Sequence, residues 1–367
     1  MRNKLVSLLL AFGIAFAVGG CSYETPSAGN DANSPSTGEE SNTPSTENGA
    51  EEGEIVKNVA WYTERGYQHL FKDPYMKNGI SVLSVKGDTR EQFKLTGSYE
   101  SPSWTFAQWH SKYDLQNYKT RRYEKGGSFM ECISYGKEVD GKYVPGKVLK
   151  IETDNPSIYM ELNAQVEFDA PKQDGEGWPH TLVSQDFSGE LVHVSELSEL
   201  IMNMDYTITK FEDKMGSAAN PAAHCAQLVW YITLQNRTKG SEGYGQYIWF
   251  GLNLWDNRKD GGVSPEYAAQ DLGKEDSTKA FIYQPSSEKI FAEKKMPRVG
   301  EKRELAFSVL ATTKYAFELA KARGYLPDTS WEDIYIGSMN FGFENTGIYN
   351  TAVQIDTVGV YYKYLGE

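Results

Sequence analysis

The sequence predicts an all-β fold, a two-sheet antiparallel sandwich of the jelly-roll type, with one short helix near residues 312–323. Apolar and polar residues alternate along many stretches, as they do in strands with one buried and one solvated face. Turn-forming residues separate these stretches, as at Asp140-Gly141, a dipeptide typical of tight hairpins. Hydrophobic residues make up 40% of the 367 residues, enough to fill the core of such a sandwich.

Three stretches show the clearest alternation, at 158–168, 226–235 and 247–255. In the last of them Ile248 and Phe250 belong to a face that is plainly core. Further candidate strands lie near 58–63, 80–86, 91–99, 103–115, 127–135, 145–153, 179–187, 200–212, 279–284, 303–310, 333–343 and 352–364.

The predicted helix at 312–323 ends before Gly324, a residue that often terminates helices. One face of this helix carries Tyr315, Ala316, Leu319 and Ala322. We expect one sandwich over 55–367. A division into two smaller sandwiches near 170–178, where Pro171 and Gly175 interrupt the pattern, is the alternative.

The N-terminus has the features of a secretory leader. Arg2 and Lys4 precede an apolar run over residues 5–18, which is short for a membrane span but suits a signal peptide. The motif Val18-Gly19-Gly20-Cys21 that follows resembles the lipobox of bacterial lipoproteins. The resemblance implies that the thiol of Cys21 receives a diacylglycerol and that cleavage occurs just before it, which would anchor the chain to a membrane on its extracytoplasmic side.

Composition divides the chain into three parts: a signal peptide at 1–20, a lipidated Cys with a disordered acidic tether at 21–54, and the β-sandwich domain at 55–367. Residues 22–54 contain no Lys or Arg and are rich in Ser, Thr, Pro, Gly and Glu, so they cannot collapse into a core. The whole chain has 37 basic and 50 acidic residues, a net charge of −13, which argues against a nucleic-acid partner. We expect a monomer.

Aromatic side chains account for 13% of the residues, and several lie on strand faces that would otherwise be solvated. Aromatic rings cover the C–H face of a sugar, and neighbouring amides bind its hydroxyls, so this combination predicts an oligosaccharide groove. The predicted ligand-binding residues on these faces are Gln227, Tyr231, Tyr247, Trp249, Asn253, Trp255 and Asn340. The alternative is that Trp249 and Trp255 form a second small core beneath a loop or the helix.

The triplet Gln108-Trp109-His110 resembles one found in concanavalin-like jelly-roll polysaccharide lyases. The resemblance implies that Gln108 and Trp109 contact the substrate and that His110 takes part in proton removal from a uronic acid. Tyr361-Tyr362-Lys363 resembles a Tyr-containing strand of the same enzymes, whereas their Arg-x-Glu element has no match here. A surface histidine with no role in catalysis is the alternative for His110.

Three carboxylates, Asp186, Asp256 and Glu344, adjoin aromatic or amide-rich strands and are candidates for glycoside hydrolysis. That reaction needs two carboxyl groups roughly 5–5.5 Å or 6.5–9.5 Å apart. The alternative for Asp256 is turn chemistry and a surface ion pair with Arg258. The sequence shows no cofactor-binding fingerprint, and neither a cofactor nor a metal site is predicted.

Cys132 and Cys225 would remain after lipidation of Cys21, either as two buried thiols or as a disulfide. Taken together, the sequence predicts a membrane-anchored lipoprotein that binds oligo- or polysaccharide through an aromatic and amide-lined groove. A glycoside hydrolase or polysaccharide lyase on the same scaffold is one alternative, and a structural or protein-binding lipoprotein is another.

Overall fold

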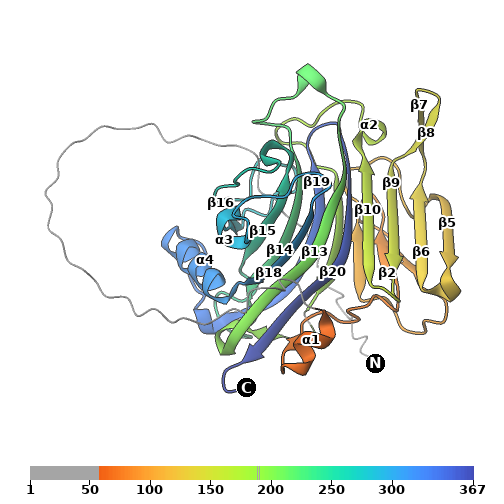
Figure 1. Cartoon of the computed structure of the whole chain (residues 1–367). Coiled ribbons are helices and arrows are strands. Elements are labelled where there is room, and N and C mark those ends of the chain that lie inside the picture. The colour runs from red at the N-terminus through yellow and green to blue at the C-terminus, as the bar shows by residue number, and fades with distance from the viewer. Residues whose placement is uncertain (1–57, 188, 190) are drawn as a thin grey trace, which may run out of the picture.

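The computed structural model describes residues 58–187, 189 and 191–367, so the predicted leader, Cys21 and the whole tether lie outside the described residues. Two large sheets face each other across one hydrophobic core, which confirms the predicted all-β sandwich (Figure 1). No helix in the described ranges is long and apolar enough to cross a membrane.

Sheet A contains eight strands in the order β18-β13-β20-β10-β9-β6-β5, with β1 paired to β20. Its two longest strands, β13 and β20, cross the front of the molecule in Figure 1, with β10, β9, β6 and β5 to their right. The strands are β1 Gln68–His69, β5 Tyr118–Glu124, β6 Phe129–Ser134, β9 Lys147–Glu152, β10 Ser157–Asn163, β13 Leu197–Asp213, β18 Lys302–Ser308 and β20 Tyr349–Tyr364.

Sheet B contains ten strands in the order β16-β17-β15-β14-β19-β11-β4-β2-β3, with β12 paired to β19. Most neighbours are antiparallel, as expected, but β15 pairs with β17 and β2 with β4 in parallel. The strands are β2 Ile80–Leu83, β3 Arg90–Phe93, β4 Trp104–Ala107, β11 His180–Asp186, β12 Val192–His193, β14 Ala226–Asn236, β15 Tyr247–Asp256, β16 Tyr267–Gln270, β17 Phe281–Gln284 and β19 Ile334–Asn345.

A small third sheet pairs β7 (Gly136–Val139) with β8 (Lys142–Pro145). Asp140 and Gly141 form its two-residue turn with positive φ at both positions, so the predicted hairpin is confirmed. The helices are α1 Val59–Glu64, α2 Ala164–Glu167, α3 Ser287–Ile290 and α4 Leu310–Ala322. Short 3₁₀ turns cover Lys125–Gly127, Val194–Glu196, Gly216–Ala218, Asn257–Lys259 and Trp331–Asp333.

The core lies between the two sheets and is filled from both inner faces. Trp230, Phe250 and Phe341 of sheet B and Met160 and Met204 of sheet A are fully buried in one continuous cluster. Strands from before and after residues 170–178 are neighbours in both sheets, as β4 beside β11 and β10 beside β20 show. That segment therefore does not divide the strands into two sandwiches.

Several predicted strands are wrong in part or in full. Those expected near 91–99 and 103–115 end at Phe93 and Ala107, so Gln108-Trp109-His110 follows a strand and is not part of it. Residues 59–64 form helix α1, because the side chain of Asn58 accepts a hydrogen bond from the backbone N–H of Trp61 and caps a helix there. The predicted strand at 158–168 ends at Asn163, and α2 follows because Glu167 is drawn into a buried ion pair with Lys147.

The buried face of α4 also differs from the prediction. Its buried residues are Thr313, Ala316, Phe317 and Ala320, whereas Tyr315 is exposed at the surface. The helix packs beside β13 and β15 at the edge of the core, so it does not cover the outer face of sheet B.

The edge strand β5 closes one side of sheet A. Its sequence is polar and charged, and most of its side chains are exposed. Arg121 pairs with Glu91, and Arg122 pairs with Glu124 and Glu131.

Candidate functional site

The predicted site residues gather on the outer face of sheet B, the side turned away from sheet A. In β19, Met339, Phe341 and Phe343 belong to the core, so Asn340 and Glu344 point outward. Register then aligns Glu344 with Gln227 of β14 and with His180 of β11, and Asn340 with Tyr231 and Ser184. On β15, Asp256 lies opposite Gln227, Asn253 opposite Val229, and Trp249 opposite Thr233.

Trp255 is not on this face, and the expectation that it shares a face with Trp249 is wrong. A β-bulge in β15, where Trp255 pairs with Leu228 but Asn253 pairs with Val229, shifts the alternation by one residue. Trp255 therefore lies in the core against Phe211 and Phe343, fully buried. The same bulge returns Asp256 to the outer face.

The aromatic rings of the outer face form a second cluster, which we call the ring cluster: Trp178, Val229, Tyr231, Trp249 and Ile282, with Trp109, Tyr247, Tyr267 and Ala280 at its edge. Trp249 is 1% exposed, Tyr231 0% and Trp178 5%. The expected open aromatic groove is therefore not observed. The reason is the loop between β16 and β17, where Thr278 accepts a hydrogen bond from the Trp249 indole N–H at 3.4 Å.

Two amides on this face are buried yet incompletely bonded. Asn340 is 0% exposed, and neither its Oδ1 nor its Nδ2 has a hydrogen-bond partner in the part of the chain that the structure describes. Asn253 is 5% exposed, and its Oδ1 likewise lacks a partner there. A buried polar group without a partner costs about 1–3 kcal/mol, so these two amides lower the stability of this face.

An ionic cluster lies beside the ring cluster and is made of His110, His180, Lys274, Asp276 and Glu344. His180 Nε2 is 3.6 Å from Glu344 Oε1, His110 Nε2 is 3.4 Å from Asp276 Oδ2, and Lys274 Nζ is 4.0 Å from Asp276 Oδ1. The rings of the two histidines are 6.1 Å apart. His180 and Glu344 are almost completely buried, whereas His110 and Asp276 are partly exposed, so this cluster runs from the interior to the surface at one end of the outer face.

Burial and charge move the pKa values of this region. Burial, reinforced by the Lys274 cation, holds the pKa of His180 well below its usual value, so this imidazole is neutral. Burial would raise the pKa of Asp276, but the hydrogen bond with His110 and the charge of Lys274 lower it, so this carboxyl is ionised. Burial and the nearby charge of Glu344 raise the pKa of Tyr231, whose hydroxyl accepts a hydrogen bond from Gln284 Nε2.

The three candidate carboxylates, Asp186, Asp256 and Glu344, do not lie together as a carboxyl pair. Asp186 is exposed and lies opposite Ser338, six residues before Glu344, which corresponds to about 20 Å along the strand. Asp256 and Glu344 flank Gln227 from two sides, so their backbones are about 10 Å apart. Asp256 also accepts hydrogen bonds from the Arg258 side chain at both oxygens, so it anchors the turn after β15.

Gln108 has a structural role in this protein. It is fully buried, its amide donates to Leu83 O and Asp114 Oδ1, and its carbonyl accepts from the Leu115 backbone. Trp109 and His110, by contrast, follow the end of β4 and reach the outer face, where Trp109 packs edge-on against His180 at 5.9 Å.

Cys132 and Cys225 are both buried and are not joined to each other by a disulfide. Among the described residues, no group of three or more His, Cys, Asp or Glu side chains is arranged to hold a metal ion.

Four residues of the site were not predicted: Trp178, His180, Lys274 and Asp276. Trp178 and His180 are two residues apart in Trp178-Pro179-His180 at the start of β11. That spacing of an aromatic residue and a histidine is the sequence signal that could have identified them as site residues. Lys274 and Asp276 lie in a loop with no periodicity, and the contact of Asp276 with His110 spans more than 160 residues of sequence.

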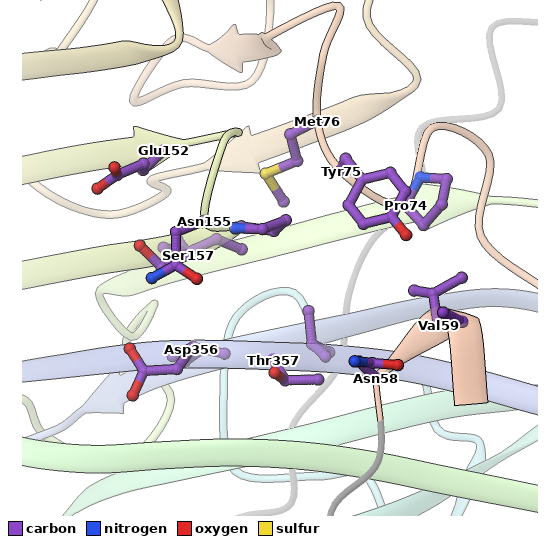
Figure 2. A pocket seen from close by; sticks show the side chains of 15 residues that line it. Asn58, Val59, Pro74, Tyr75, Met76, Glu152, Asn155, Ser157, Asp356 and Thr357 are labelled. Carbon is purple, nitrogen blue, oxygen red and sulfur yellow. The ribbon is translucent and has the colours of Figure 1, made fainter. Parts of the chain in front are cut away.

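A separate cavity of about 270 Å³ lies outside sheet A, between α1, the loop at 74–76, the β9–β10 turn and β20. Figure 2 shows Tyr75 and Pro74 on one side and Asn155, Ser157 and Asp356 on the other. The side chains of Asn155 and Asp356 are exposed. None of the predicted ligand-binding residues lines this cavity.

No protein-family model and no curated protein matches the chain. Solved structures with a similar arrangement include a native family 12 xyloglucanase from Bacillus licheniformis, with 12% identity, coverage of 69% of this chain and 100% of that chain, and a TM-score of 0.37. Endoglucanase cel12A from Rhodothermus marinus has 15% identity, coverage of 67% and 96%, and a TM-score of 0.34. The family 11 xylanase from Neocallimastix patriciarum has 11% identity, coverage of 66% and 95%, and a TM-score of 0.34. At these TM-scores the likeness assigns neither an activity nor a ligand to this chain.

Proposed function

We propose that this protein binds an oligo- or polysaccharide on the outer face of sheet B. The observation that carries the proposal is the position of Asn340 and Asn253 on the face that also holds the ring cluster. Both amides are buried and have hydrogen-bonding atoms that no described residue satisfies. A sugar offers both matching surfaces, C–H groups for the rings and hydroxyls for the amides.

The neighbouring groups support a neutral or weakly charged glycan. Gln284 and Tyr231 hold each other by a hydrogen bond, and Ser184 lies opposite Asn340, so hydroxyl and amide groups continue along the face. Glu344 is the buried carboxylate opposite His180, and His180 is neutral at physiological pH because burial lowers its pKa. The lysine of the ionic cluster, Lys274, has Asp276 beside it.

Binding is better supported than hydrolysis. Asp256 is tied to Arg258, and Asp186 lies about 20 Å along the strand from Glu344, so neither is placed as the second carboxyl that glycoside hydrolysis requires.

We further propose that the chain is a lipoprotein, held by a lipidated Cys21 on the extracytoplasmic side of a membrane, with residues 22–54 as its tether. The support is the order of the leader features: basic residues, an apolar run, two glycines and a cysteine. Loss of membrane association in a Cys21→Ser variant that is still secreted is the expected result, and unchanged membrane association would contradict the proposal.

Glycan binding is tested by calorimetry with the chain from residue 22 onward and a panel of polysaccharides. We expect Trp249→Ala to lower the affinity at least about ten-fold, since the loss of one ring contact of about 1.4 kcal/mol has that effect. Tyr99→Ala removes an aromatic ring that is 95% exposed elsewhere on the surface and serves as the matched control. A folded Trp249→Ala variant with wild-type affinity for every bound glycan would refute the site, and new reducing ends after incubation would favour the enzyme.

A further inference from the structure

One loop, residues 271–280 between β16 and β17, lies across the ring cluster. Thr278 contacts the indole nitrogen of Trp249, and the Nζ of Lys274 lies 5.7 Å from the ring centroid of Trp178. Ala280 packs at the edge of the same cluster. The loop therefore contacts the two tryptophans that the proposed glycan site requires.

The two ends of the loop have unusual backbone geometry. Gly273 has a φ of +85° and Lys279 a φ of +62°. The left-handed region costs a residue with a side chain about 1–2 kcal/mol, so Lys279 holds strain that a rearranged loop would release. Such positions absorb the backbone rotation when a loop moves, so Gly273 and Lys279 are suited to act as hinges.

Several contacts fasten the loop to the neighbouring segments, and two of them lie near Gly273 and Asp276. Asp276 meets His110 at 3.4 Å, and the backbone N–H of Gly175 donates to Gly273 O. Asp271 accepts hydrogen bonds from both the backbone N–H and the hydroxyl of Thr278, which keeps the loop folded on itself. The side chains of His110 and Asp276 are 28% and 27% exposed, so water can compete for this contact.

We propose that residues 274–278, between the hinges Gly273 and Lys279, form a lid that covers the ring cluster in the free protein and swings away when a glycan chain binds; this proposal rests on the glycan site proposed above. The contact between Asp276 and His110 is the latch. Opening about Gly273 and Lys279 removes Thr278 from Trp249 and Lys274 from Trp178. A sugar ring then takes the place of the loop against the two indoles.

The variant Asp276→Ala removes the latch, and Glu275→Ala is its matched control, because Glu275 is the adjacent acidic residue and is exposed. The first readout needs no ligand: acrylamide quenching of tryptophan fluorescence. We expect quenching to increase in Asp276→Ala and to remain at the wild-type level in Glu275→Ala. The increase should become smaller when Trp249→Phe is combined with Asp276→Ala, and should disappear when Trp178→Phe is added as well, because only the covered ones of the eight tryptophans should respond.

The second readout is the association rate for a bound polysaccharide, followed by stopped flow. If the loop must open before the polysaccharide binds, loss of the contact between Asp276 and His110 makes opening easier. We expect association to be about three- to ten-fold faster in Asp276→Ala than in the wild type. Equal quenching and equal association rates in Asp276→Ala and wild type overturn the lid, and the glycan site stands if both proteins bind. If quenching increases but no glycan binds to either protein, the proposed function fails and the loop is only a cover. Should Asp276→Ala unfold, Asp276→Asn gives the same test, since it keeps the size of the side chain and removes its charge.

Discussion

Replacement of Asn340 by leucine tests whether the outer face of sheet B is built for a ligand at the expense of stability. The amide is 0% exposed, and both of its polar atoms lack partners among the described residues. Each unsatisfied buried polar group costs about 1–3 kcal/mol, and leucine fills a similar volume with no polar atom. We therefore expect Asn340→Leu to raise the free energy of unfolding by about 1–3 kcal/mol and to weaken glycan binding.

The assay is urea unfolding of the chain from residue 22 onward, monitored by fluorescence and circular dichroism. Asn236 provides the matched control, because it is equally buried but bonded at both ends: Nδ2 donates to Thr329, and Oδ1 accepts from Thr238 N and Ser241. Asn236→Leu should lower the free energy of unfolding by about 1–3 kcal/mol or more. If Asn340→Leu destabilises the protein as much as Asn236→Leu does, the amide of Asn340 is satisfied in the free protein and the reasoning is refuted.

Three further predictions concern stability and reactivity. Lys147→Met and Glu167→Gln should each lower the free energy of unfolding by about 3–5 kcal/mol, because each leaves the other member of a completely buried ion pair without its counter-charge. The double variant should cost clearly less than their sum, and additive urea-unfolding values would contradict a direct pair. Burial lowers the pKa of His69 to about 4, against 6.5 in an unfolded chain, so its contribution to stability is complete above pH 6.5 and falls by about 3 kcal/mol as the pH drops toward 4. His69→Asn should flatten this part of the curve of unfolding free energy against pH. An unchanged curve would show that His69 is not the group that titrates. Cys132 and Cys225 are buried, and burial raises the pKa of the Cys132 thiol to about 12, so both should react with a thiol reagent only after unfolding. If the native protein reacts as fast as the protein unfolded in urea, the two thiols are not buried.

Alternation along the chain was sufficient to predict the β-sandwich and most of its strands, because one face of each long strand is core. It failed where a single residue changes the count. The bulge in β15 sends Trp255 into the core, and no feature of Ile248 to Asp256 marks that position before the strand is paired. Capping likewise overrode alternation at α1, where Asn58 begins a helix in a stretch that otherwise resembles a strand.

The candidate site was predictable in its residue types and less so in its accessibility. Tyr231, Trp249, Asn253, Asn340 and Glu344 share a face because β14, β15 and β19 are neighbours, which their common pattern of rings and amides anticipated. The covering of the rings depends on a loop far away in sequence, and no local pattern encodes that contact.

The polar character of edge strand β5 has a consequence for molecules crowded side by side. An open sheet edge offers unpaired backbone groups to any neighbouring sheet, and such pairing starts fibrous aggregation. Strand β5 carries a lysine, two arginines and a glutamate. Pairing of a second sheet with β5 would bring like charges together and remove them from water, so this edge resists self-association without another subunit covering it.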